Sequence, residues 1–349
     1  MLESNLKNMS LDQLKQWLIN NSISKVHAKS VFQWLYREEK KTGTEVESLP
    51  LRLHQFLSEH PPGLSLNLQQ RINSQDGSQK FVFLSSRGKF ETVWIPFKNR
   101  ITLCVSSQVG CALDCGFCLT GLLPFKGNLE PWEMVDQLLQ TQNLMGQKVT
   151  NVVFMGMGEP LLNFENAKRA VEILTCPYGL SIAKSKITVS TAGYIPGILR
   201  WGREVGTNLA VSVIAASHEK RNRLMPINAQ FPLDALVRAI HEYTLITRKK
   251  VFCEYLLIDG LTDSFQDAKA LAKWFKKMNV TINLIPYNEN HQFNYKRPPK
   301  ERVDQFKSWL HEEGILSTVR WSHGSDIGAA CGQLSGYGNY YRKEGILDS

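Results

Sequence analysis

Three cysteines lie within eight residues, in the stretch Cys111-Ala-Leu-Asp-Cys115-Gly-Phe-Cys118. This spacing requires the chain to present three thiols from one tight loop. Soft thiolate ligands favour iron–sulfur clusters and zinc. No fourth Cys lies near, and a zinc site would need a second close pair of Cys or His residues. The loop therefore predicts a [4Fe–4S] cluster with one open iron; three unrelated buried cysteines, or a zinc site completed from afar, are the alternatives.

Composition limits the class of protein further. The chain has 349 residues, seven cysteines and a net charge of +9. It contains no run of about eighteen apolar residues and no apolar segment typical of a signal peptide. Clustered rather than paired cysteines favour metal or redox chemistry in a reducing compartment, so we expect a cytoplasmic protein. The basic balance favours a polyanionic partner such as RNA or DNA.

The pattern of apolar residues divides the chain into four segments. Residues 1–62 show helical spacing with interleaved basic and aromatic side chains, which is typical of a small accessory domain that contacts RNA. Residues 63–100 hold short alternating runs that predict strands leading into the core. Residues 101–334 form the predicted catalytic domain, and residues 335–349 a C-terminal tail.

From about residue 100 the pattern becomes strand, loop, helix, repeated. Such alternation predicts parallel strands joined by right-handed crossovers, and hence an α/β fold with an open six-stranded barrel. The predicted strands are 101–106, 151–156, 186–190, 208–213, 251–256 and 281–286, with another near 317–320. The predicted helices between them include 131–145, 164–175, 232–246, 265–277 and 300–313.

Polar residues and glycines follow several of these strands directly. They are Gly158 and Glu159, Ser190, Ser212 and Asn288. Each alone is more often a turn-former. Because the carboxyl ends of parallel strands meet at one mouth, their recurrence predicts a shared site with the cysteine loop.

The cysteine spacing, with Phe117 before the last Cys, resembles the signature of radical S-adenosylmethionine (SAM) enzymes. Further motifs resemble the RlmN/Cfr family of 23S rRNA adenine methyltransferases over about residues 80–334. These motifs are Thr102-Leu-Cys104-Val-Ser-Ser-Gln-Val-Gly-Cys111, Phe154-Met-Gly-Met-Gly-Glu-Pro160, Leu224-Met-Pro-Ile-Asn228 and Ala330-Cys-Gly-Gln-Leu334.

The resemblance implies a role for each motif residue. Cys111, Cys115 and Cys118 would bind the cluster, and Gly158, Glu159, Ser190, Ser212 and Asn288 would contact SAM. Cys331 would carry the methyl group, Cys104 would resolve the intermediate through a disulfide bond, and Glu91 would accept a proton. One departure stands at Ser212-Val-Ile214-Ala, where the family usually has Ser-Leu-His-Ala, so a His contact to SAM is lost or replaced.

The implied reaction is methylation of adenosine C2 in the peptidyl transferase centre of 23S rRNA, with tRNA as a further substrate. It would consume two SAM molecules per turnover and take electrons from a flavodoxin or ferredoxin. The alternatives are methylation at C8 of the same adenosine and a non-catalytic RNA-binding iron–sulfur protein. S-methylation of Cys331 would distinguish an enzyme from a binding module.

Overall fold

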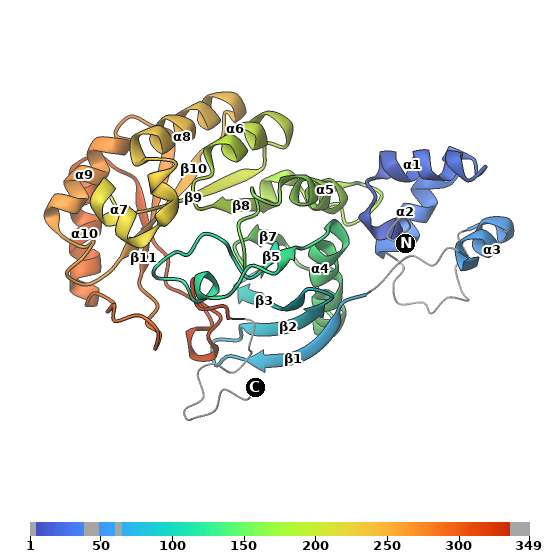
Figure 1. Ribbon diagram of the computed structural model, residues 1–349, viewed down its shortest axis with the longest axis horizontal. Helices are drawn as coiled ribbons and strands as arrows, with labels where there is room; N and C mark the ends of the chain where they lie inside the picture. The colour runs from blue at the N-terminus through green and yellow to red at the C-terminus, as the bar shows by residue number, and fades with distance from the viewer. Residues whose placement is uncertain (1–4, 38–48, 60–64, 336–349) are drawn as a thin grey trace.

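The computed structural model describes residues 5–37, 49–59 and 65–335. The first two of these segments form short helices set to one side of the barrel (Figure 1). The side chain of Ser10 accepts from the Gln13 N–H and so caps the first long helix. The helices are η1 (Leu6–Asn8), α1 (Leu11–Asn20), η2 (Lys25–His27), α2 (Ala28–Arg37) and α3 (Leu51–Glu59).

The described strands form one ten-stranded sheet and one two-stranded pair. In the large sheet β1 to β4 are antiparallel neighbours, and every pairing from β4 onward is parallel. The antiparallel strands are β1 (Asn67–Asn73), β2 (Gln79–Ser85) and β3 (Gly88–Phe97). The parallel strands are β4 (Arg100–Cys104), β7 (Asn151–Phe154), β8 (Ile187–Thr191), β9 (Asn208–Ile214), β10 (Val251–Leu257) and β11 (Val280–Pro286), followed by a short β12 (Ser317–Val319).

Helices follow the parallel strands and surround the curved sheet (Figure 1). Along β8, buried Ile187 and Val189 alternate with half-buried Thr188 and Ser190, which leaves one face for the helices and one for the barrel interior. The helices are α4 (Pro131–Met145), α5 (Phe164–Thr175), α6 (Ile195–Glu204), α7 (His218–Leu224), α8 (Leu233–Thr247), α9 (Phe265–Phe275) and α10 (Lys300–Glu312). The predicted open barrel with N-terminal helices is confirmed, and the further strand predicted near 317–320 is β12, a short seventh parallel strand.

The predicted domain boundaries fall partly outside the described residues. The break near residue 62 lies in the gap 60–64, and of the predicted tail 335–349 only Ser335 is described. The strands predicted within 63–100 extend the barrel sheet directly, because β3 pairs with β4. Within the described ranges no helix is both long and apolar enough to cross a membrane.

Candidate active site

The cysteine loop occupies residues 110–126, between β5 (Gln108–Val109) and β6 (Gly127–Asn128). These two short strands pair antiparallel and close the loop at its base. Gly110 lies in the left-handed region, and a Cβ there would fall 2.1 Å from the carbonyl oxygen of Pro124. Only glycine allows the two ends of the loop to cross so closely.

The three thiols of the loop lie near one another. Burial raises the pKa of Cys111 to about 12, with the nearby Cys118 thiol adding to the effect. Burial also raises the pKa of Cys115 well above its ordinary value, and Cys118 and Cys111 raise it further. The thiols therefore influence one another's ionisation, and they become ligands only when positive charge stabilises their thiolates. Among the described residues, no three Cys, His, Asp or Glu side chains form a ready-made metal site.

A buried arginine supplies positive charge next to this loop. Arg221 in α7 is fully buried, and burial lowers its pKa to about 10. Its guanidinium donates to the carbonyl oxygens of Val213 (3.1 Å) and Ala192 (2.8 Å) and to the side-chain oxygen of Asn228 (2.8 Å). No described carboxylate lies within ion-pair distance of Arg221, yet its charge lowers the pKa of Cys115. An iron–sulfur core held by three thiolates is anionic overall, so this uncompensated guanidinium fits it.

The loop after β7 brings Gly158 and Glu159 against the cysteine loop. A Cβ on Gly158 would lie 2.4 Å from the Gln108 Cβ, so an L side chain is excluded. The buried carboxylate of Glu159 accepts from the N–H groups of Leu161 (3.0 Å) and Ala192 (2.7 Å). Burial nevertheless raises the pKa of Glu159 to about 7. This carboxylate can therefore bind an ammonium group and change protonation near neutral pH.

The next strands place the two predicted serines inside the barrel. Ser190 and Ser212 are half-buried, and within the described residues neither hydroxyl hydrogen-bonds to another protein group. Asn288, after β11, is buried and already engaged: it donates to the Cys331 carbonyl (3.0 Å) and accepts from Arg297 (3.1 Å). The two serines thus offer open hydroxyls, whereas Asn288 orients the Cys331 segment.

Cys331 and Cys104 come together from distant parts of the sequence, and both are free thiols. Cys331 as a residue reaches the surface, and desolvation of its thiol by the neighbouring protein raises the pKa of that thiol. Burial, together with the nearby Cys331, raises the pKa of Cys104 to about 12. Cys331 also lies near Cys118, because the Leu119 N–H donates to the Gly332 carbonyl at 2.8 Å.

Glu91 lies inside the protein, although a strand carboxylate usually faces water. Its Oε1 lies 3.2 Å from the Nζ of Lys80, and neither side chain is exposed (0%). Its Oε2 accepts from the N–H of Ser335 at 3.0 Å. Val93 pairs with Cys104 across the sheet, so Glu91, two residues earlier, faces the same side as Cys104. The structure therefore gathers Glu91, Cys104 and the Cys331 segment in one place.

Two charged residues outside the motifs, Glu254 and Arg320, also lie near Cys331. Glu254 pairs in register with Ser212, and its Oε1 accepts from Asn283 at 3.0 Å. Arg320 lies 3.6 Å from the same oxygen, and its charge lowers the pKa of Cys331. Burial raises the pKa of Glu254, whose Oε2 has no partner among the described residues. Neither residue stands in a recognisable motif, so only the topology could reveal them.

Ile214, at the departure from the usual Ser-Leu-His-Ala, adopts φ +65°. A β-branched residue in the left-handed region is a true outlier, whereas His is tolerated there more readily. The side chain packs with Leu224, Met225 and Tyr287 beside the cysteine loop. The backbone at residue 214 therefore holds the strained left-handed conformation although an apolar Ile stands where the family usually has His.

Comparison with known proteins agrees with this architecture. Residues 105–275 match the Radical SAM superfamily. The structure superposes on the crystal structure of a radical SAM methyltransferase from Sphaerobacter thermophilus with a TM-score of 0.89 and 36% identity, covering 95% of this chain and 99% of that one. The open barrel, the three-cysteine loop and these matches define a radical SAM enzyme.

The curated relatives narrow the class to one family. The dual-specificity RNA methyltransferase RlmN of Syntrophobacter fumaroxidans is 40% identical over 333 residues, covering 94% of this chain and 97% of the relative. That of Geobacter sulfurreducens is 40% identical over 332 residues, covering 95% and 92%. The chain belongs to the RlmN family. Like the family, it uses a [4Fe–4S] cluster and SAM, two molecules per turnover.

Proposed function

We propose that this protein methylates C2 of an adenosine in the peptidyl transferase centre of 23S rRNA, and an adenosine of tRNA, through an S-methylcysteine on Cys331. The relatives named dual-specificity RNA methyltransferases support the substrate class. The observation that carries the proposal is that the Cys331 segment lies against the cysteine loop, where the Leu119 N–H donates to the Gly332 carbonyl at 2.8 Å, with Cys104 close enough to interact with Cys331.

Each side chain has a place in this reaction. Cys111, Cys115 and Cys118 hold the cluster, with the Arg221 charge beside them. Glu159 binds the SAM ammonium group, the Ser190 and Ser212 hydroxyls bind further polar groups of SAM, and Gly158 lets the backbone approach it. Asn288 contacts SAM through its side-chain amide, whose NH2 group also donates to the Cys331 carbonyl. Bound there, the cluster and SAM would supply the radical chemistry needed to activate the methyl group that Cys331 carries.

The adenine C2 is electron-poor and cannot displace the methyl group of SAM, but a thiolate can. Cys331 therefore takes the methyl group first, and Arg320 favours its thiolate. After the carbon joins the base, Glu91 accepts the C2 proton. The Cys104 thiolate then attacks the Cys331 sulfur, so that an S–S bond forms as the S–CH2 bond breaks. The electron pair of that bond stays on the carbon, which takes up a proton and leaves as the methyl group of the base.

The partners follow from charge and chemistry. A net charge of +9 suits an RNA backbone, and the target base must leave its stack to enter the barrel mouth. A low-potential flavodoxin or ferredoxin supplies the electron. Free thiols that cycle through one disulfide suit a reducing cytoplasm.

The test is methylation of an rRNA fragment by the anaerobically reconstituted protein, followed by mass spectrometry of the released nucleosides. We expect 2-methyladenosine with the wild type and none with Cys331→Ala. A product methylated at C8 would contradict the position, and product formation by Cys331→Ala would contradict the mechanism. Loss of product with Glu91→Gln, with the carbon still attached to the protein, would identify the proton acceptor.

A further inference from the structure

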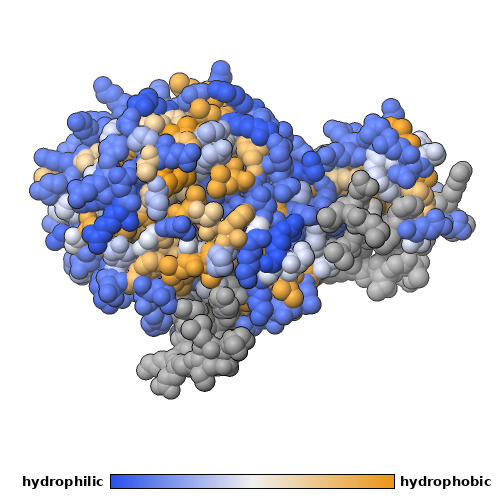
Figure 2. All heavy atoms as spheres, in the orientation of Figure 1, coloured by the Kyte–Doolittle hydropathy of each residue, from blue (hydrophilic) through white to orange (hydrophobic). Residues whose placement is uncertain are grey.

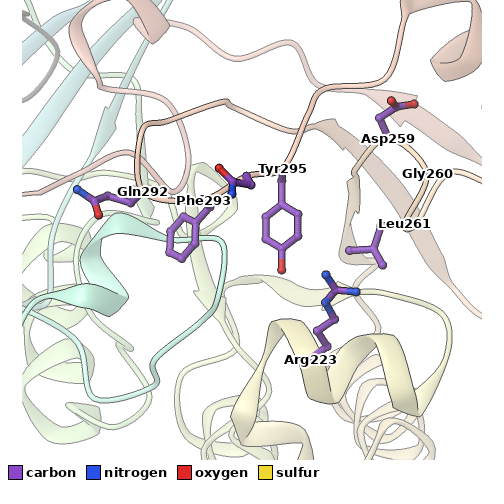
Figure 3. Close-up of a pocket in the computed structure, with 8 residues that line it drawn as sticks. Arg223, Asp259, Gly260, Leu261, Gln292, Phe293 and Tyr295 are labelled. Carbon is purple, nitrogen blue, oxygen red and sulfur yellow. The ribbon is translucent and has the colours of Figure 1, made fainter.

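A cavity of about 460 Å³ lies beside the barrel mouth (Figure 3). Arg223 reaches it from α7, Asp259 and Leu261 from the loop after β10, and Phe293 and Tyr295 from the loop after β11. Its described lining includes none of the residues proposed to bind SAM or the cluster. It is therefore a separate site, built at the same end of the strands.

Aromatic rings form one wall of this cavity. The Phe293 and Tyr295 rings are close to parallel, with planes 19° apart and centroids 6.4 Å apart. Tyr295 packs edge-on against buried Tyr287, with centroids 5.8 Å apart, which fixes its orientation. The Arg223 guanidinium lies 5.9 Å from the Tyr295 centroid and points toward the ring (Figure 3). Oriented rings with an arginine beside them are a stacking surface for a planar ligand.

The charges of the lining distinguish a base from a phosphate. Arg223 is exposed and forms no ion pair with any described residue, so its donors are available. Asp259 lines the same cavity with an exposed carboxylate, which disfavours a phosphate but accepts from an exocyclic amine or ring N–H. A donor and an acceptor beside a stacking surface match the edge and the face of a nucleobase.

The exposure of the lining residues favours a base within an RNA strand over a free cofactor as the ligand of this cavity. Arg223, Asp259 and Asn294 are exposed, so a ligand here keeps one side in water. Cofactor pockets enclose most of the ligand. The cavity lies next to the cysteine loop, since Tyr295 packs against the apolar cluster that also contacts Cys115. In the view of Figure 1, the surface of the molecule shows apolar residues gathered near the centre, with hydrophilic residues around them (Figure 2).

We propose that this cavity binds an unstacked nucleobase of the RNA substrate, next to the adenosine that enters the barrel. The inference rests on the proposed function, since it takes RNA as the substrate. Extrusion of the target base leaves its neighbours without a stacking partner, and the Phe293–Tyr295 wall replaces that partner.

The test measures binding of a short 23S rRNA hairpin, containing the target adenosine, to the anaerobic holoenzyme by fluorescence anisotropy. We expect Tyr295→Leu to weaken binding about five- to hundred-fold, as for loss of one base–aromatic stack, while Tyr295→Phe stays near wild type. Replacing the flanking nucleotide with an abasic one should weaken wild-type binding and leave Tyr295→Leu unchanged. The proposal would be overturned if Tyr295→Leu bound RNA as tightly as the wild type, or if it lost affinity for SAM instead of for RNA.

Salt dependence separates base from phosphate contact. Arg223→Ala should weaken RNA binding without changing the slope of log K against log salt, and the surface control Arg203→Ala should leave affinity near wild type. A slope reduced by about one in Arg223→Ala would assign the cavity to a phosphate and overturn the proposal. Failure of the wild type to bind or methylate the hairpin would instead count against the proposed function.

Discussion

Lys80 and Glu91 form an ion pair that is closed off from water between β2 and β3, and Lys80→Met tests what it contributes. The Lys80 Nζ lies 3.2 Å from Glu91 and also donates to the Gly328 carbonyl at 3.3 Å. Glu91 in turn accepts from Ser335. The pair therefore ties the sheet to the segment that carries Cys331.

The expected loss follows from burial. Both side chains are 0% exposed, so Lys80→Met removes the Lys80 charge while the Glu91 carboxylate stays buried. Removing one partner of a buried pair costs about 3–5 kcal/mol, because the remaining charge keeps its desolvation penalty. Met retains most of the side-chain volume, so lost packing contributes little. The double variant Lys80→Met, Glu91→Leu removes both charges and should recover most of the loss.

Denaturant unfolding of the anaerobic protein gives the free energies of unfolding. Lys168→Met is the matched control, because Lys168 and Glu204 form a pair of 2.6 Å with side chains 29% and 31% exposed. It should cost far less than Lys80→Met, because this pair is solvent-screened and Glu204 also pairs with Arg200. The reasoning is wrong if Lys80→Met costs no more than this control, or if the double variant is as unstable as Lys80→Met alone.

Substitutions near the proposed SAM site give three further tests, at Glu159, Ile214 and Gly158. Burial raises the Glu159 pKa from 4.5 to about 7, so the SAM affinity of the wild type, measured by calorimetry, should fall as pH drops below about 7, whereas that of Glu159→Gln should not. The stability of the wild type without SAM should fall as pH rises from 4.5 through about 7, because the folded state holds the proton more tightly. A flat affinity profile would contradict the ammonium contact. Ile214→His should bind SAM about fivefold more tightly, as for one added hydrogen bond, whereas equal affinity would show that the backbone already makes this contact. Gly158→Ala should lower the free energy of unfolding by more than about 1 kcal/mol and by more than Gly146→Ala, which also has a positive φ (+64° against +93°) but open space around it. Equal losses would refute the steric argument.

Strong apolar periodicity predicted most of the barrel from the sequence, including α4 and α5 with their observed bounds. Two helices were missed for physical reasons. Pro196, Gly197 and Gly202 break the pattern of α6, which holds its place by burying Ile198 and Trp201. In α7 the buried residues are Arg221 and Leu224, and a buried cation gives no apolar signal.

The site was predictable where the chemistry is local and not where it is assembled from afar. The cysteine loop and the strand-end residues follow from spacing and from the rule that carboxyl ends of parallel strands meet. Lys80, Glu254 and Arg320 escaped sequence reasoning because strand pairing and the C-terminal segment bring them to the mouth. The assigned roles of the motif residues stay predictions.

The transfer of a carbon from Cys331 to RNA is the central claim, and the variant Cys104→Ala tests it most directly. Without the resolving thiol, the RNA-bound carbon should remain attached to the protein after one turnover. We predict a covalent protein–RNA adduct that peptide mass spectrometry maps to Cys331, and its absence in Cys104→Ala, Cys331→Ala. Release of methylated RNA by Cys104→Ala at the wild-type rate, with no adduct, would contradict the account.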